Sequence, residues 1–162
     1  MSPFALTLLA LAALCGQTPP PAAAFFAHRG GTVVEVHANS TASLYLEQCH
    51  GWRAIILESD PVRCTELTHA RPHTTVVCGD VSRTAHLLVD TLGVRRVDLL
   101  TVALRDGAAH ITPLLLALDA IDVLQVEMSS DEEVVRALAT RAGLRASHFA
   151  QWELGFALFY RE

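Results

Sequence analysis

Short apolar runs alternate along the chain with segments of helical periodicity, and this alternation limits the possible folds more than any other feature. The central runs are continuous and rich in β-branched residues, without the polar–apolar alternation of a half-exposed strand. Such runs are typical of strands whose two faces are both covered by helices, as in a parallel sheet. We expect strands at residues 32–36, 53–57, 74–78, 97–103 and 122–126.

Helices are expected in the segments between these strands. They would run from Ser43, as a cap, to near Gly51, and over residues 61–70, 83–92, 109–118 and 131–142. Pro61 suits the first turn of its helix and Gly93 follows the end of another. Because single helices connect successive strands, the crossovers are expected to be right-handed and the sheet parallel.

The end of the chain breaks this pattern. Residues 145–149 and 156–160 are expected to be strands with a short connection, which permits only an antiparallel hairpin at the sheet edge. Five β-α units followed by a hairpin is the layout of Rossmann-like methyltransferases, whereas nicotinamide-binding domains more often end in a sixth parallel strand. The sequence therefore predicts one α/β domain over residues 25–162, with a doubly wound, mostly parallel sheet.

The first 24 residues are predicted to be a secretory signal peptide. They carry no charged side chain, and their apolar run, residues 4–14, is shorter than the roughly 20 residues that span a bilayer. Three prolines at 19–21 end any helix, and three alanines at 22–24 offer a cleavage site before Phe25. A basic start is missing, so an organelle presequence and a buried N-terminal helix are alternatives. The domain is accordingly expected to be secreted or to lie in a secretory or organelle lumen.

Three cysteines would remain after cleavage: Cys49, Cys64 and Cys78. An odd number does not make a closed disulfide framework, so we expect buried free thiols, with one disulfide and one free thiol as the alternative.

Charge and motifs exclude several classes of function. The net charge of −5 disfavours nucleic acid as the main partner, and no segment predicts stable membrane insertion. No metal site is expected, because the histidines are scattered without cysteine or carboxylate at ligand spacing. The chain also lacks the G-x-S-x-G, G-x-G-x-x-G and Walker patterns.

Acidic residues at successive strand ends are the candidate binding site. In doubly wound sheets the ligand lies at the carboxyl ends of the strands, where the strand order reverses, which would place residues 35–41, 58–60, 80–82 and 103–107 around one crevice. Glu58 closes the second strand, where a carboxylate can accept both hydroxyl hydrogens of a ribose, and Asp80 could accept from an adenine amino group. Solvent-exposed turn residues are the alternative interpretation.

Three segments resemble the first third of FkbM-type methyltransferases: VEVHAN at 34–39, LYLE at 44–47 and HGWRAIILE at 50–58. The later strands and the closing segment are also similar, so the resemblance extends from Thr32 to the C-terminus. It implies a fold that binds S-adenosylmethionine (SAM) and, in most members, methylates hydroxyl groups of sugars and small metabolites. On this basis the cofactor-binding residues are expected to be Glu35, Ala38, Asn39, Glu58, Asp80 and Val81, and the catalytic base is not identified.

The chain also departs from that family. His37 stands where the family has a glycine, so its ring is expected to crowd the methionine end of SAM, and a second glycine is absent around residues 40–41. After the fourth strand, Ala103 and Arg105 replace an aspartate and a glutamate. These changes support an alternative function, a catalytically inactive secreted interaction domain that retains the fold.

Overall fold

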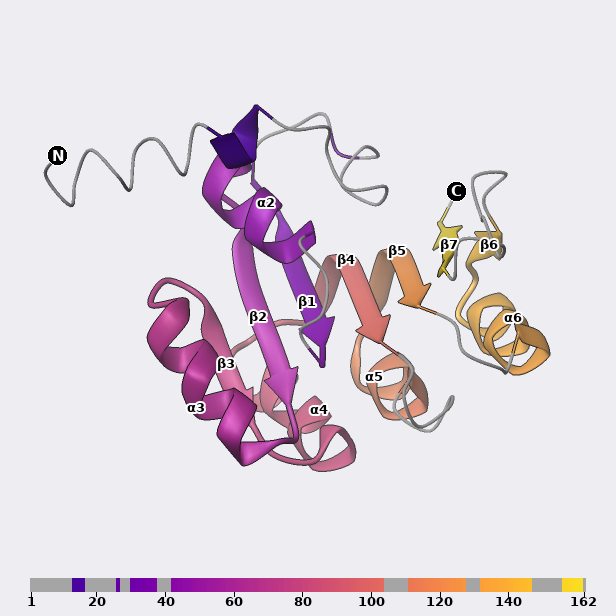
Figure 1. Ribbon diagram of the computed structural model, residues 1–162. Coiled ribbons are helices and arrows are strands. Elements are labelled where there is room, and N and C mark those ends of the chain that lie inside the picture. Colours follow the sequence, from indigo (N-terminus) through magenta and orange to yellow (C-terminus); the bar gives the residue numbers. More distant parts are fainter. Residues whose placement is uncertain are drawn as a thin grey trace, which may run out of the picture.

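A single mixed sheet organises the computed structural model, which describes residues 13–16, 26, 30–37, 42–103, 111–127, 132–146 and 156–161. Figure 1 shows the strands fanning out from β3 at one side to β6 and β7 at the other. Along the chain the elements are β1 (Thr32–Val36), α2 (Ala42–His50), β2 (Arg53–Glu58), α3 (Pro61–Ala70), β3 (Thr75–Cys78), α4 (Val81–Asp90), β4 (Arg96–Ala103), α5 (Ile111–Ala117), β5 (Ala120–Glu127), α6 (Glu132–Arg141), β6 (Arg145–Ala146) and β7 (Phe156–Tyr160).

The strand order is β3-β2-β1-β4-β5-β7-β6. The first five strands of this order are parallel to one another, while β7 is antiparallel to both β5 and β6. This arrangement confirms the predicted parallel sheet with a C-terminal antiparallel hairpin. The order reverses between β1 and β4, so the carboxyl ends of these two strands form the edge at which ligands bind in such sheets. Strand β6 has two residues, shorter than the predicted 145–149, of which 147–149 lie outside the described residues.

Two apolar cores cover the two faces of the sheet. On β1, Val34 and Val36 face a large core that includes residues of α4, α5 and α6. Val33, one position away, faces a smaller core with α2 and the buried Trp52, whose ring meets Phe26 edge-on at 4.5 Å. Alternate residues of a strand point to opposite faces, which explains why the continuous apolar runs supply both cores.

Local hydrogen bonds explain where the helices begin. Asp60 caps α3 by accepting from the backbone N–H groups of Val62 and Arg63, and Pro61 occupies the first turn as predicted. Asp80 caps α4 in the same way, so this helix begins two residues earlier than expected. Ser43 was expected to cap α2, but it lies within the helix, and its hydroxyl donates to Glu35 instead.

The expectation of free thiols is wrong, because all four cysteines form disulfides. Cys64 in α3 is bonded to Cys78 at the end of β3, and Cys15 is bonded to Cys49 in α2. Cys78 is exposed, not buried as expected. Only the disulfide between Cys64 and Cys78 lies within the predicted mature domain; the signal peptide itself stays a prediction.

None of the helices in the described parts of the chain has the length and apolar character of a membrane-spanning helix.

We predict that replacing Cys64 and Cys78 by alanine lowers the free energy of unfolding by about 3 kcal/mol, the usual effect of closing a loop of this size. The two cysteines are 14 residues apart, and the bond ties α3 to the neighbouring strand. Urea unfolding of the double variant and of the wild type measures the difference. A loss below about 1 kcal/mol would contradict a stabilising role.

We predict that a chain processed before Phe25 contains one reactive thiol, because cleavage removes Cys15 and leaves Cys49 without its partner. A chain that retains residues 1–24 would contain none. Secreted protein is alkylated without reduction and its intact mass is measured. This mass gives both the number of free thiols and the first residue of the processed chain. Three alkylated thiols in the processed chain would contradict the disulfide between Cys64 and Cys78.

Candidate functional site

A buried polar row crosses the sheet near the carboxyl ends of β1, β4 and β5. Glu35 lies opposite Thr101, and Thr101 lies opposite Gln125, so all three side chains share the face covered by α2. Their exposed fractions are 1%, 3% and 7%. The row below them on this face consists of apolar residues of the smaller core, so the polar side chains begin where the strands approach their ends.

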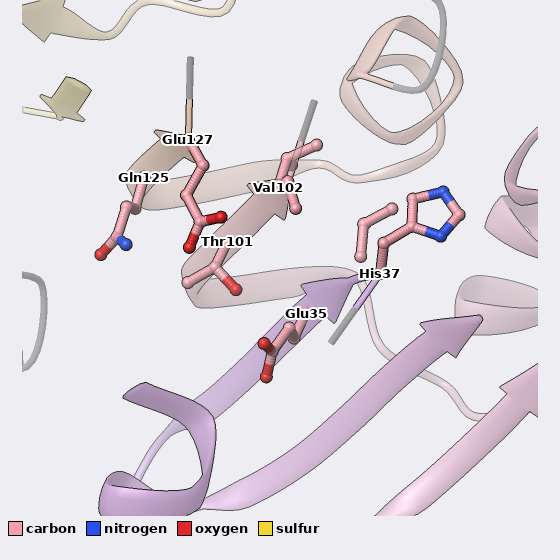
Figure 2. Close-up of a pocket in the computed structure, with 8 residues that line it drawn as sticks. Glu35, His37, Thr101, Val102, Gln125 and Glu127 are labelled. Atoms are coloured by element: carbon pink, nitrogen blue, oxygen red, sulfur yellow. The ribbon is translucent and has the colours of Figure 1, made fainter. Parts of the chain in front are cut away.

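A narrow cleft lies above this polar row. Its lining consists of Glu35, Val36, His37, Thr101, Val102, Ala103, Gln125 and Glu127, and the side chains leave no space wide enough for a water molecule. Figure 2 shows Glu35, Thr101, Gln125 and Glu127 on one side, with the His37 ring apart from them. Thr101 Oγ1 and Gln125 Oε1 are buried and have no hydrogen-bond partner within the described part of the chain. Such atoms are costly to bury, which makes the cleft a candidate for ligand contact.

The negative charge of the Glu35 carboxylate is balanced by residues of α2 and of the end of α3. Ser43 donates a hydrogen bond to it, and Arg71 lies 3.9 Å away. The Arg71 guanidinium also donates to Ser43 Oγ at 3.0 Å and to Glu47 at 3.3 Å. Thr74 completes the network by donating to Glu47 at 2.8 Å. The sequence predicts Glu35 as a cofactor ligand; the structure places its charge in an internal network.

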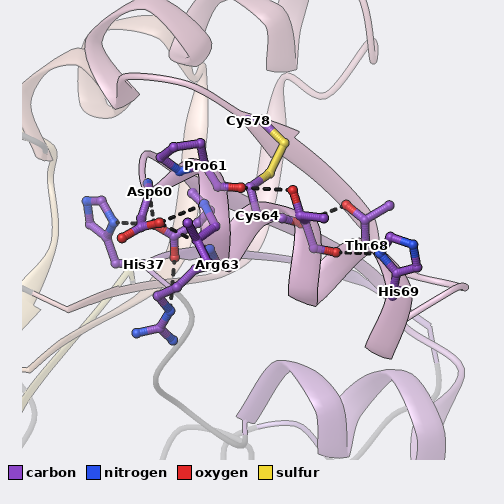
Figure 3. Close-up of a disulfide and its surroundings, with 11 residues drawn as sticks. His37, Asp60, Pro61, Arg63, Cys64, Thr68, His69 and Cys78 are labelled. Atoms are coloured by element: carbon purple, nitrogen blue, oxygen red, sulfur yellow. Dashed lines mark hydrogen bonds and ion pairs between the residues drawn. A yellow bond between two sulfur atoms is a disulfide. The ribbon is translucent and has the colours of Figure 1, made fainter.

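Glu58, at the end of β2, is the second buried carboxylate, with an exposed fraction of 2%. Its Oε1 accepts from the backbone N–H of Asp60 at 3.0 Å, and His37 Nδ1 lies 3.3 Å from the same oxygen. Its Oε2 has no hydrogen-bond partner among the described residues, although Arg63 Nε lies 3.7 Å away. Figure 3 shows His37, Asp60 and Arg63 gathered at one end of α3. One oxygen of this carboxylate is therefore in use and the other is still able to accept.

His37 has an unusual backbone conformation. Its φ is 57°, the left-handed region that glycine adopts most easily, and it stands where the resembled family has a glycine. Its N–H donates to the Leu57 carbonyl at 2.9 Å, so the residue is held against the end of β2. We expected the imidazole ring to crowd the methionine end of SAM; the structure instead places it on Glu58, the predicted ribose ligand.

The other predicted ligands are placed as follows. The Asp80 carboxylate accepts from the N–H and the hydroxyl of Ser82, as an N-cap. The Val81 side chain is fully buried in the larger core, so it could meet a ligand only through its backbone. Ala38 and Asn39 lie outside the described residues. Among the described residues, Glu58 and Asp80 do not line the cleft that Glu35 lines, and the single crevice of three carboxylates stays a prediction.

The sequence patterns do not predict three of the residues that line the cleft: Thr101, Gln125 and Glu127. Each is a polar residue within or at the end of an apolar run, which is a visible signal in the sequence. Their proximity, however, depends on the register between β1, β4 and β5, which the sequence alone does not specify.

The fold is similar to several solved methyltransferases. A TehB-like SAM-dependent methyltransferase from Corynebacterium glutamicum is 21% identical, with 98% of this chain and 96% of that chain covered at a TM-score of 0.62. Fibrillarin from Aeropyrum pernix, solved with natively bound SAM, is 19% identical. The match covers 94% of this chain and 73% of that chain, at a TM-score of 0.60. A putative caffeoyl-CoA O-methyltransferase from Staphylococcus aureus is 9% identical. The match covers 82% of this chain and 76% of that chain, at a TM-score of 0.58.

No family model matches the sequence, and no curated protein matches it either. The FkbM-type assignment therefore depends on the motifs alone. At such low identities the structural similarity concerns the arrangement of strands and helices. On that evidence, this chain has the Rossmann-like fold of SAM-dependent methyltransferases.

Proposed function

We propose that the chain binds SAM and transfers its methyl group to a small-molecule acceptor. The observation that carries the proposal is the buried Glu58 carboxylate at the end of β2, with one oxygen still able to accept a hydrogen bond. A carboxylate at this place in a doubly wound sheet suits a ribose diol, because it can accept from both hydroxyl groups. The structurally similar fibrillarin from Aeropyrum pernix was solved with bound SAM, which supports the same cofactor for this chain.

The described residues fit the nucleoside half of SAM by type and position. Glu58 would hold the ribose, and Asp80, two residues after the adjacent strand β3, would lie at the adenine side. By the resemblance to FkbM-type proteins, Glu35, Ala38, Asn39 and Val81 would surround the rest of the cofactor. When bound, SAM supplies an electrophilic methyl group on a sulfonium.

The acceptor would lie over β4 and β5. Adjacent strands are about 4.8 Å apart, so β5 lies roughly three spacings, about 14 Å, from β2. In this proposal Thr101, Gln125 and Glu127 would lie beyond the cofactor's ribose. We infer an acceptor hydroxyl on a sugar or small metabolite, oriented by Thr101 and Gln125. Glu127 would accept the proton of this hydroxyl group, while bound SAM would supply the methyl group and leave as S-adenosylhomocysteine when its methyl carbon–sulfur bond breaks.

A specific observation favours a second candidate, an inactive interaction domain. Glu35 and Asp80 are engaged by internal hydrogen bonds, Glu58 is engaged in part, and the cleft is closed by its own side chains. The predicted signal peptide also supports action in a secretory or organelle lumen, where SAM, made in the cytosol, would have to be supplied. Calorimetric titration with SAM and S-adenosylhomocysteine separates the candidates: micromolar binding supports the enzyme, and no heat at millimolar ligand supports the interaction domain.

We predict that Glu58→Ala weakens SAM binding by about 1–3 kcal/mol, because the ribose hydroxyl groups lose a buried acceptor. Calorimetry on the wild type and the variant measures the change. Glu66→Ala is a matched control, since it removes an exposed carboxylate from α3, the helix that follows β2. Equal affinity of wild type and Glu58→Ala would refute the role of Glu58.

We predict that Glu127→Gln lowers kcat at least about a hundredfold and leaves SAM affinity unchanged, because it removes a base without removing a cofactor contact. The assay follows transfer of labelled methyl groups from SAM to a panel of monosaccharides and small polyols. Unchanged kcat with an accepted substrate would show that another group takes the proton.

A further inference from the structure

The two oxygens of Glu58 differ in how they are used. Oε2 has no hydrogen bond in the described structure, and Arg63 Nε, at 3.7 Å, neutralises its charge without occupying its acceptor capacity. Oε1 accepts from the Asp60 N–H and from the His37 ring. A ribose diol presents two hydroxyl groups, and a carboxylate binds them in a bidentate way when each of its oxygens accepts from one of them. The His37 ring therefore stands where the second hydroxyl group would donate.

The position of His37 next to the end of β2 explains this overlap. Residue 37 directly follows β1, and β1 is paired in parallel register with β2, so His37 faces the end of β2 where Glu58 lies. The exposed fraction of the His37 side chain is only 14%, and Ser59 Oγ lies 3.5 Å from its Nδ1. The ring is thus packed against the strand end that a nucleoside would approach.

The backbone conformation shows that this placement is specific. A non-glycine residue at a φ of 57° is strained, and such strain persists only where surrounding contacts maintain it. These contacts include the hydrogen bond from the His37 N–H to Leu57 and the ring contact with Glu58. A glycine would adopt the same backbone without strain and without a ring.

The geometry points to His37 as an intramolecular competitor for the ribose site: its imidazole occupies Glu58 Oε1 and must leave before a cis-diol of a nucleoside ligand can bind both oxygens. This inference rests on the proposed function, since it assigns Glu58 to the ribose. It makes His37 the residue that sets the affinity of the site for ribose-containing ligands.

The test is a ligand-binding comparison with and without the diol. We predict that His37→Gly raises the affinity for adenosine about tenfold, the ratio expected for one net hydrogen bond, and leaves the affinity for 2′,3′-dideoxyadenosine unchanged. Calorimetry of both nucleosides, and of SAM, on wild type and variant measures this. His73→Gly is the matched control, because it removes an imidazole from an exposed turn.

A measurement without ligand tests the contact itself. Glu58→Gln should shift the imidazole proton resonances of His37 and leave those of His73 in place. Unchanged His37 resonances would overturn the inference.

The outcomes separate this inference from the proposed function. A gain for adenosine alone supports competition at Glu58. Equal adenosine affinity in wild type and His37→Gly, or an equal gain for the dideoxynucleoside, would overturn the inference, and SAM binding by the wild type would still support the proposed function. If neither protein binds SAM or adenosine at millimolar concentration, both fall, because freeing Glu58 would not have created a ribose site.

Discussion

The pairing of β1 with β2 on one side and β4 on the other determines the rest of the candidate site. This register places Glu35 at the centre of the sheet, between Ile56 and Thr101, where its carboxylate cannot reach bulk water. An isolated buried charge costs several kcal/mol, so a cation must be brought to it. Arg71 supplies that cation from the end of α3, and Ser43 supplies a hydrogen bond from α2. The helices on this face are thereby joined to the central strand by charge as well as by apolar packing.

The two buried carboxylates are satisfied to different degrees, and this difference bears on function. Glu35 has its partners within the fold, in a network that ends at Glu47 and Thr74. Glu58 lies nearer the strand ends, and its contacts come from His37, Asp60 and Arg63, while one oxygen makes no hydrogen bond in the described chain. A ligand can contact the second oxygen of Glu58 without displacing a hydrogen bond, whereas a ligand at Glu35 would have to displace Ser43 and Arg71. The carboxylate of β2 is therefore the better candidate for ligand binding.

The sequence predicts the fold well because continuous apolar runs and helix caps are local signals. Each predicted strand and helix is found, and the antiparallel end follows from the short connection before β7. The site is less predictable, because contacts such as Thr101 beside Gln125 arise from register, which one sequence does not encode locally. Ser43 illustrates the same limit: its type favours a cap, but a buried carboxylate on the neighbouring strand uses its hydroxyl. Cysteine pairing likewise depends on which elements the fold brings together.

By the resemblance to FkbM-type proteins, a histidine follows β1 where that family has a glycine, and the backbone conformation of this histidine can be compared with that of a glycine. A side chain that merely replaced a glycine would favour a relaxed backbone, yet His37 keeps the left-handed φ that the glycine position requires. His37 therefore combines a left-handed backbone with a ring whose Nδ1 lies 3.3 Å from Glu58 Oε1. In the proposed competition, the contact from this side to Glu58 Oε1 is made by one side chain, so removing the ring tests the competition without a change in the sheet.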